Sequence, residues 1–390
     1  MTAPSPFELI ENTSFADYNV SATKLTGGMI NFVWRLENAQ GHTVVLKYAS
    51  EAMSEYPHAP MSIERLEFEA RGLCLLNGPR PLAASLLQIP HMRLLAELGI
   101  NMPQTSGVHV PRLLHYDNSK SFVILEDLGD LQPYNEWNSP TQPARSLDDL
   151  LFVSRHVGQW IARLHGFGLD NMYVLKQYFV NTPAQEFLGS VFYDVLREHV
   201  TEHPLLAHDK NELVSAIDNF DELVQQADAA SKTMLFGDLW SGSILFDPSK
   251  RIVNIVDLEF ADIGLIFADV AHFAAHLLPT HFLCNPSYNP ASDACPETTI
   301  AFLRAYRQTL KAEYPEAYRR LISPQSVKLS AMFFGMEIAR DVLTGYWCRC
   351  GKSPSPDEGE LPLSCECADL LLPYSTNFMK GAVSFFDQLL

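Results

Sequence analysis

Basic residues are scarce in this chain of 390 residues. It has 28 lysines and arginines against 46 aspartates and glutamates, which gives a formal net charge of −18. A protein that grips a phosphate backbone needs a basic surface, so this balance argues against a nucleic-acid partner. A polybasic membrane anchor is disfavoured for the same reason. We therefore expect neither nucleic acid nor a membrane as a partner.

Long uninterrupted apolar runs are also missing. The most apolar long stretch, Ile263 to Leu278, contains Asp269, His272 and His276, and it is too short and too polar to cross a bilayer. The first fifteen residues hold no basic segment followed by an apolar one, so we expect no secretory signal peptide. These absences predict a cytoplasmic protein.

Cysteines are few, and their number, seven, is odd. In a chain without a signal peptide this favours reduced thiols over a disulfide framework. Four of them form the pairs Cys348-x-Cys350 and Cys365-x-Cys367 on either side of a loop rich in proline, glycine and acids. A zinc clip is one interpretation, but structural zinc sites usually space their cysteines more widely. Thiols at the base of a flexible hairpin are the interpretation we prefer.

The apolar fraction of 47% and the charged fraction of 19% indicate a soluble globular protein of two or three packed units. The first 128 residues read as strands with one main helix. Glycines interrupt the first strand, and Ser62 is the expected N-cap of the helix. The predicted segments are strands Lys24–Leu36, Thr43–Tyr48, Val110–Tyr116 and Ser121–Glu126, the helix Ser62–Leu76, and a helical insertion over Pro79–Gly107.

After Leu128 the chain becomes mainly helical, beginning with a loop rich in proline and asparagine over 133–143. The predicted helices are Leu147–His165, Thr182–Val200, Lys210–Ala229, Thr298–Glu313, Ser326–Tyr346 and Cys367–Leu390, and the short strands are Met234–Phe236, Ser243–Phe246 and Arg251–Val256. The sequence therefore predicts an α+β, two-lobed fold. Residues 1–128 form a small β-rich lobe, and residues 129–390 form a larger helical lobe.

The most informative stretch for chemistry runs from Leu235 to Glu259. Asp257 ends a strongly apolar strand, and an acid there is costly unless it is hydrogen-bonded or binds a cation. Glu259 shares its face if the chain stays extended, and two hard oxygen ligands suit Mg²⁺. Ser243 is expected to supply a further oxygen near the metal. Asp238, in a loop with two glycines, is placed to orient the proton of an attacking hydroxyl, although Gly-Asp is also a common turn.

Two features of the first lobe point to phosphate. Gly27 and Gly28 interrupt a strand pattern, which often marks the close approach of a ligand to the backbone. Lys47 lies within an apolar strand, where a lysine alone is commonly a solvated edge residue. Beside a glycine turn and a helix that carries Glu69, it is better interpreted as a nucleotide-phosphate contact held by that glutamate.

These motifs, in this order, resemble the small-molecule kinases of the aminoglycoside phosphotransferase and choline kinase superfamily. GGMINFVW is similar to the glycine-rich loop, FVILEDLGDL to the strand and hinge that hold adenine, and FGDLWSGS with VDLEFADIG to the catalytic and metal loops. The resemblance implies a protein-kinase-like fold with ATP and Mg²⁺ between the lobes. It places adenine at Glu126, Asp127 and Leu128, and a small hydroxylated acceptor at Asp238.

Within this group the chain resembles the methylthioribose kinases, which carry Gly-Asp-Leu-x-x-Gly-Ser and Asp-x-Glu-Phe-Ala. In those kinases the glycine loop ends in Asn-Phe-Val, which matches Asn31 and its neighbours and sets Asn31 over the phosphates. The resemblance also nominates Arg340 as an acceptor contact and implies a homodimer. A second similarity, around LTGGMINFVWRL and DLWSG, is to fungal hydroxytryptamine kinases, which share Trp240.

Phe236 is the clearest departure from the superfamily, which usually has histidine before Gly-Asp. We expect a methylthioribose-type kinase and keep two alternatives: a kinase of a hydroxy-amine, and a pseudokinase that binds nucleotide without transferring phosphate. A zinc-stapled interaction module at 348–367 would be a third alternative. His272, His276 and His281 are interpreted as histidines near the end of a helix that is followed by Pro279, because no acid or cysteine in the sequence completes a clear zinc site.

Overall fold

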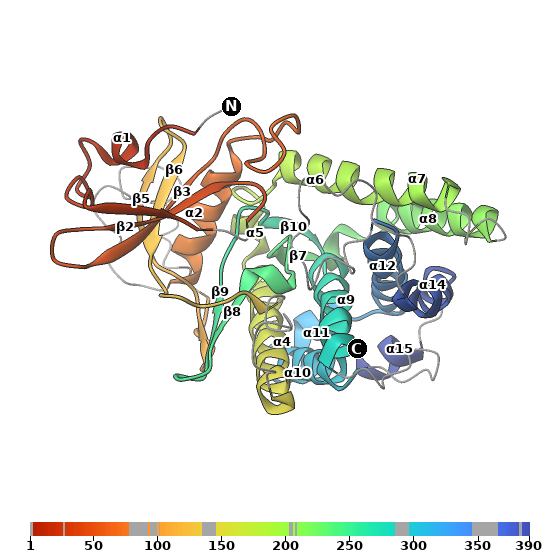
Figure 1. Cartoon of the computed structure of the whole chain (residues 1–390). Helices are drawn as coiled ribbons and strands as arrows, with labels where there is room; N and C mark the ends of the chain where they lie inside the picture. Colours follow the sequence, from red (N-terminus) through yellow and green to blue (C-terminus); the bar gives the residue numbers. More distant parts are fainter. Residues whose placement is uncertain are drawn as a thin grey trace.

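The computed structural model describes residues 3–25, 28–77, 93, 100, 102–134, 146–202, 206, 209–284, 296–344, 366–381 and 384–390. A β-sheet forms one end of the molecule and helices form the other, as Figure 1 shows. The prediction of an α+β, two-lobed fold is therefore confirmed. The boundary at residue 128 stays a prediction.

The N-terminal sheet has five antiparallel strands in the order β1-β2-β3-β6-β5. Their bounds are β1 Ser21–Lys24, β2 Phe32–Glu37, β3 Thr43–Tyr48, β5 Leu113–Asp117 and β6 Phe122–Glu126. The short helix α1 (Pro6–Ile10) covers one face of the sheet and α2 (Arg65–Leu76) lies against the other. β2 pairs with β3, and β5 pairs with β6, in each case with the strand that follows it in the sequence.

Alternation along the strands separates the two faces of this sheet. Trp34 and Leu36 of β2 join Leu46 of β3 in a small core that also contains the apolar side chains of α1. Val33 is next to Trp34 in β2 and pairs with Lys47 of β3, so both of these residues lie on the opposite face. The same pattern that builds the small core therefore turns Lys47 toward the helical part of the molecule.

Two small sheets connect the N-terminal sheet to the helices. β4 (Val108–His109) runs parallel to β9 (Ile252–Ile255), which pairs with β8 (Ile244–Asp247). β7 (Lys232–Leu235) pairs with β10 (Asp262–Leu265). Asp238 follows β7, and Asp257 and Glu259 follow β9, so the paired strands hold the loops that carry these acids.

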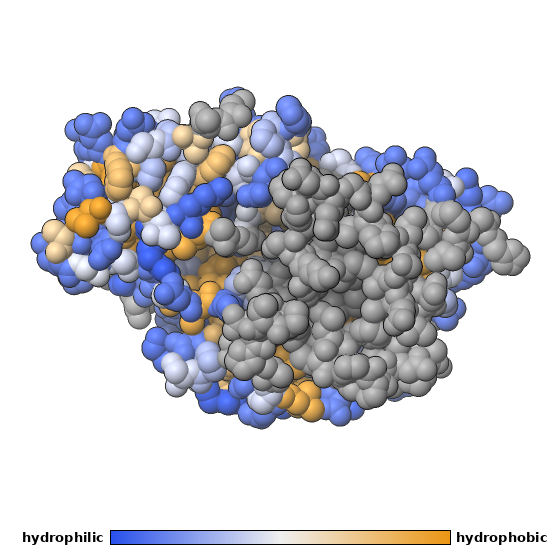
Figure 2. All heavy atoms as spheres, viewed as in Figure 1, coloured by the Kyte–Doolittle hydropathy of each residue, from blue (hydrophilic) through white to orange (hydrophobic). Residues whose placement is uncertain are grey.

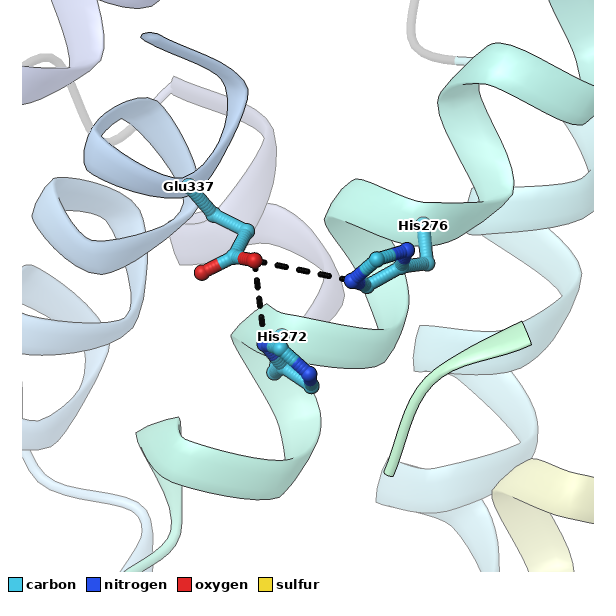
Figure 3. A group of neighbouring side chains, drawn as sticks. All are labelled: His272, His276 and Glu337. Carbon is cyan, nitrogen blue, oxygen red and sulfur yellow. Dashed lines mark ion pairs between the residues drawn. The ribbon is translucent and has the colours of Figure 1, made fainter. Parts of the chain in front are cut away.

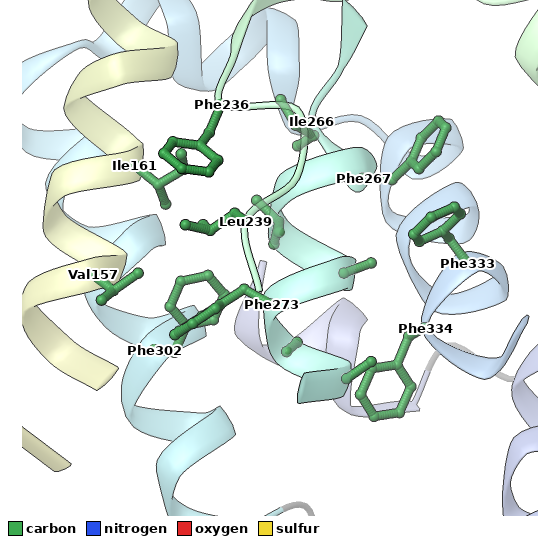
Figure 4. Packing of buried hydrophobic residues seen from close by; sticks show 14 of the residues in the cluster. Val157, Ile161, Phe236, Leu239, Ile266, Phe267, Phe273, Phe302, Phe333 and Phe334 are labelled. Atoms are coloured by element: carbon green, nitrogen blue, oxygen red, sulfur yellow. The ribbon is translucent and has the colours of Figure 1, made fainter. Parts of the chain in front are cut away.

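The helices are amphipathic or apolar, and they bury a continuous core. α4 (Leu147–Asp170), α9 (Phe267–Cys284) and α10 (Glu297–Glu313) pack around Phe236, Phe273 and Phe302, as seen in Figure 4. Ser146 caps α4 by accepting a hydrogen bond from the Asp149 backbone N–H. The other helices are α5 Met172–Leu175, α6 Thr182–Gly189, α7 Val195–Glu202, α8 Lys210–Gln225, α11 Pro315–Leu321, α12 Pro324–Leu343, α14 Glu366–Met379 and α15 Ser384–Leu389.

Several predicted segments were wrong in detail. The first strand is not continuous, because β1 ends at Lys24 and β2 begins only at Phe32. α2 has Glu64 as its N-cap, because the Ser62 hydroxyl instead accepts a hydrogen bond from the Glu64 N–H before the helix starts. The helix predicted over 182–200 is divided by a π-helical turn over 190–194. β10 and α11 were not predicted, and α9 continues through Pro279.

Some predictions fall outside the described residues. They concern Gly27, most of the insertion at 79–107, most of the loop at 133–143, Cys348, Cys350 and Cys365, and the side chains of Cys367 and His281. Among the residues described, no helix is long and apolar enough to cross a membrane.

The contact between α4 and α10 generates a stability prediction. A Cβ atom at Gly158 would collide with the Phe302 carbonyl oxygen. We expect Gly158→Ala to lower the free energy of unfolding by about 1–3 kcal/mol, because the helices must separate. Urea denaturation measures it. Gly189→Ala is the control, since nothing lies within 4 Å of the added methyl group; it should be neutral or slightly stabilising. Equal effects of the two substitutions would contradict the close packing.

Candidate functional site

A cavity of about 1380 Å³ lies between the N-terminal sheet and the helices. Figure 2 shows hydrophobic side chains in a recess beside the sheet, with hydrophilic ones around it. At one end the cavity is lined by Val33, Val45, Lys47 and Leu128, and at the other by Asp238, Trp240 and Arg340. Residues from both predicted lobes thus meet in one cavity.

Lys47 is the centre of a buried group of charges. Its Nζ lies 2.8 Å from Glu69 Oε2 and 3.6 Å from Glu259 Oε2, and it also contacts Asp257 Oδ1. The carboxylates of Glu69, Asp257 and Glu259 each offer an oxygen within 4.8 Å of the others. The structure therefore brings together four residues that the sequence nominated from three separate segments.

Burial and charge oppose each other in this group. Burial alone would lower the pKa of Lys47, but the three facing carboxylates outweigh it and raise that pKa above its usual value. Burial raises the pKa of Glu69, and Lys47 only partly offsets this. Burial also raises the pKa of Glu259. Carboxylates in excess over ammonium in a buried site favour a further cation.

Asn31 and Arg65 hold Glu259 from the side of the N-terminal sheet. Asn31 Nδ2 donates to Glu259 Oε2 at 2.6 Å, and Asn31 Oδ1 accepts from Arg65 Nε at 3.0 Å. Arg65 Nε also lies 3.4 Å from Glu259 Oε2. The Asn31 amide thus connects the glycine segment to Glu259, and Asn31 also lines the cavity. Its place over the phosphates stays a prediction. Gly28 is exposed and lines the cavity.

Asp257 is the most accessible of the three acids, with 36% of its side chain exposed, against 1% for Glu69 and Glu259. The chain is not extended there as predicted: Asp257 has a φ of +79°, in the left-handed region. Its carboxylate nevertheless reaches the same group as that of Glu259. The turn at Asp257 brings its carboxylate close to that of Glu259, whereas the sequence suggested that strand alternation would do so.

The predicted hinge follows β6 and lines the cavity. The Glu126 carboxylate accepts from the Arg112 backbone N–H at 3.1 Å and from Arg112 Nε at 3.2 Å. The Asp127 carboxylate pairs with Arg35, with Nε–Oδ2 at 2.6 Å. Both acids are therefore engaged within the sheet, and Leu128 supplies an apolar side of the cavity.

The loop that carries Asp238 begins with a tight turn. Gly237 has a φ of +94°, and a Cβ atom there would collide with the Phe260 carbonyl oxygen. Phe236, before it, is fully buried and lies edge-on to Trp160 at 6.0 Å between ring centroids. Figure 4 shows the ring directed toward Ile161. A phenylalanine thus anchors this loop in the apolar core where the superfamily usually has histidine.

Asp269 holds the same loop from α9, and the sequence analysis missed this role. Its carboxylate accepts the backbone N–H groups of Phe236 and Gly237, each at 2.8 Å, and it lies 3.0 Å from His165 Nε2. Asp269 is fully buried. The sequence did hold a signal for this role: Asp269 is the acid in an otherwise nearly apolar stretch, and a buried acid needs hydrogen-bond partners.

Ser243 and Trp240 shape the far side of the loop. The Ser243 hydroxyl donates to the Trp240 carbonyl at 2.8 Å and accepts from the Trp240 N–H at 3.3 Å. Ser243 does not line the cavity, so its hydroxyl closes the loop instead of joining the acids. The Trp240 indole packs across Gly242 and does line the cavity.

The far end of the cavity contains a second group of charges. Arg340 Nη2 lies 2.7 Å from Asp341 Oδ1 and also contacts Glu337. Its guanidinium stacks on Phe192, 4.9 Å from the ring centroid. Arg340 therefore lines the cavity beyond Asp238, but its charge is already shared by two acids.

His272 connects Asp238 to this second group. Its Nε2 lies 3.2 Å from Asp238 Oδ1, and its Nδ1 lies 3.3 Å from Glu337 Oε1. Burial alone would lower the pKa of His272, but the two carboxylates raise it to about 10. His276 lies one turn further along α9, with Nε2 3.5 Å from the same Glu337 oxygen.

The family model of the phosphotransferase enzyme family matches residues 21–319. This range contains every residue nominated from the sequence except Arg340. It also includes Asp269 and the two cavity histidines.

Two groups of curated relatives match at modest identity. The 4-hydroxytryptamine kinase of Psilocybe cyanescens is 26% identical over 265 residues, covering 64% of this chain and 65% of the relative. The methylthioribose kinase of Geobacillus thermodenitrificans is 26% identical over 228 residues, 54% of each chain. The chain thus spans less than two-thirds of either relative. Among solved structures, an amicoumacin kinase in complex with AMP-PNP and Ca²⁺ has a TM-score of 0.50 at 13% identity, covering 95% of this chain and 92% of that one.

The hydrogen bonds of Asp269 generate a prediction. We expect Asp269→Ala to lower the free energy of unfolding by roughly 3–5 kcal/mol, because two buried N–H groups and His165 lose their shared acceptor. Urea denaturation followed by circular dichroism measures it. Asp148→Ala is the control: that side chain is 70% exposed, and its loss should cost no more than about 1 kcal/mol. A mild effect of Asp269→Ala would show that the loop does not depend on it.

Proposed function

Because this chain belongs to the phosphotransferase enzyme family, we propose that it transfers the γ-phosphate of ATP to a hydroxyl group of a small molecule. The observation that carries the proposal is that Lys47, its three carboxylates and Asp238 line or border one cavity. Phosphoryl transfer needs a lysine paired with a glutamate, carboxylates that can bind a metal ion, and a separate aspartate near the acceptor.

The nucleotide end is assigned to the N-terminal side of the cavity. We place adenine beside the hinge, where Leu128 and Val45 offer apolar surfaces. Lys47 contacts the phosphates while Glu69 holds its ammonium. The fixed Lys47–Glu69 pair lowers the cost of orienting the ammonium when nucleotide binds.

The three carboxylates fit Mg²⁺, which prefers hard oxygen ligands. Asp257 is the acid most open to the cavity, and Glu259 is oriented by Asn31 and Arg65. We propose these two as the residues that hold the metal, which neutralises phosphate charge when bound. Ser243 is left out of this set because its hydroxyl is engaged with the Trp240 backbone.

Asp238 is proposed as the residue that orients the acceptor hydroxyl and takes its proton. Its loop is held by Asp269 and by the buried Phe236 ring, so the carboxylate is presented to the cavity from a rigid base. The departure at Phe236 leaves this presentation intact, which supports an active kinase over a pseudokinase.

The acceptor end favours a molecule with a flat apolar body. Trp240, Phe192 and Tyr193 line the cavity there, and aromatic walls bind rings well. A hydroxylated aromatic amine of the hydroxytryptamine type is our first candidate. Methylthioribose is the second, supported by the Asp-x-Glu motif and by Arg340 in the cavity, although Arg340 is already paired with Asp341.

The decisive experiment measures ADP release from ATP·Mg²⁺ with 4-hydroxytryptamine, methylthioribose, choline and an aminoglycoside in parallel. Asp238→Asn should lower turnover at least about 100-fold while ATP binding, measured by calorimetry, persists. Turnover by the wild type with one acceptor ranks the candidates. ATP binding without turnover on any acceptor would support the pseudokinase, and full activity of Asp238→Asn would refute its proposed role.

The two metal acids should differ when they are substituted. Asp257→Asn should raise the Mg²⁺ concentration needed for half-maximal turnover at least about tenfold, with little change in stability, because this acid is partly exposed. Glu259→Gln should also lower the free energy of unfolding by about 1–3 kcal/mol, because Arg65 loses a buried partner. Magnesium titrations and urea denaturation separate the effects. An unchanged Mg²⁺ requirement in Asp257→Asn would remove it from the metal site.

A further inference from the structure

Two histidines and a glutamate converge at the acceptor end of the cavity. His272 and His276 are four residues apart on α9, so they lie on one face of the helix. Glu337 faces them from α12, as Figure 3 shows. The sequence analysis set the histidines aside because no acid completed a site. The fold supplies that acid, and we propose that these three side chains bind a transition-metal ion of the zinc class.

The separations between the atoms suit such an ion. His272 Nδ1 and His276 Nε2 lie 3.3 and 3.5 Å from Glu337 Oε1. Ligands at about 2.0–2.1 Å from a tetrahedral zinc are roughly 3.3–3.5 Å from one another. Ligand atoms of all three residues lie within 4.8 Å of one another.

The surrounding groups are those that orient metal ligands. A histidine that binds metal through one ring nitrogen usually donates from the other to a carboxylate. With Nδ1 of His272 toward the metal, its Nε2 faces Asp238 at 3.2 Å. Arg340 Nη2 contacts Glu337 Oε1, the same oxygen that the two histidines face, and holds that carboxylate in place. The other carboxylate oxygen, Oε2, has no such contact within the described part of the chain.

The charges and one unpartnered atom give independent support. Glu337 is fully buried, and its Oε2 has no hydrogen-bond partner among the described residues. Three carboxylates, Asp238, Glu337 and Asp341, surround this point, and Arg340 is the guanidinium that faces them. With neutral imidazoles the group is two positive charges short, which a divalent ion supplies.

Imidazole nitrogens select zinc, cobalt or nickel over Mg²⁺. The site is therefore distinct from the carboxylate group around Lys47. Both histidines line the cavity, so the fourth position of a tetrahedral ion opens toward it. The ion would fix α9 to α12 and hold His272 against Asp238. Metal binding here does not rest on the proposed function and can be measured without turnover.

The test uses the full chain, stripped with a chelator and reloaded with Zn²⁺ or Co²⁺. We expect one tightly held ion per chain by elemental analysis, and a rise in Tm on adding Zn²⁺ to the stripped protein. His276→Ala and His276→Gln should each weaken binding at least about 100-fold and remove the Tm rise. His42→Ala, which changes an exposed turn histidine, should bind as the wild type does.

The paired cysteines could also bind zinc, so the cobalt spectrum separates the two sites. A histidine and carboxylate site gives weak visible bands without the intense sulfur-to-cobalt charge-transfer band of thiolates. The proposal is supported if the wild type gives weak visible bands without the thiolate band, and if these bands are lost in both His276 variants and kept in His42→Ala. Failure of the wild type to hold an ion, a thiolate spectrum alone, or unchanged binding in folded His276→Gln would overturn it.

Discussion

The Lys47 ammonium, buried among three carboxylates, is the interaction on which the arrangement of the two parts depends. Lys47 comes from β3 of the sheet and Glu69 from α2, whereas Asp257 and Glu259 come from the loop after β9. None of these charges can be buried alone without a large cost. The sheet and the helical part must therefore meet here for the group to be satisfied, and the cavity forms beside it.

A second buried acid organises the other side of the cavity. Asp269 takes up the N–H groups at the turn before Asp238 and also faces His165 of α4. One carboxylate thus ties a loop to two helices. The core aromatics then fill the space around it, and Phe236 becomes part of that core. The loop is rigid because Asp269 binds its backbone N–H groups and the core holds its Phe236 side chain.

Much of the fold could be predicted because its signals are local. The short apolar runs at 43–48 and 122–126, rich in β-branched residues, are typical of buried strands, and the apolar periodicity of 147–165 reflects one face of a helix. The errors lie where tertiary packing overrides such patterns. The π-helical turn over 190–194 and the short strand β10 carry no strong periodicity of their own. Pro279 did not end α9, although proline commonly ends a helix.

The candidate site shows the same division. The residue types of Asp238, Lys47 and the Asp-x-Glu pair could be selected from sequence, because their chemistry is unusual for their local setting. The partners of Asn31, the engagement of the Ser243 hydroxyl and the position of Asp269 could not. Asn31 and Glu259 are 228 residues apart, and Lys47 and Asp257 are 210 apart. The sequence by itself determined the strands, the helices and the reactive groups, because these follow from neighbours along the chain. Only the tertiary structure decided which charges face each other, because burial makes each of them depend on a partner from a distant segment.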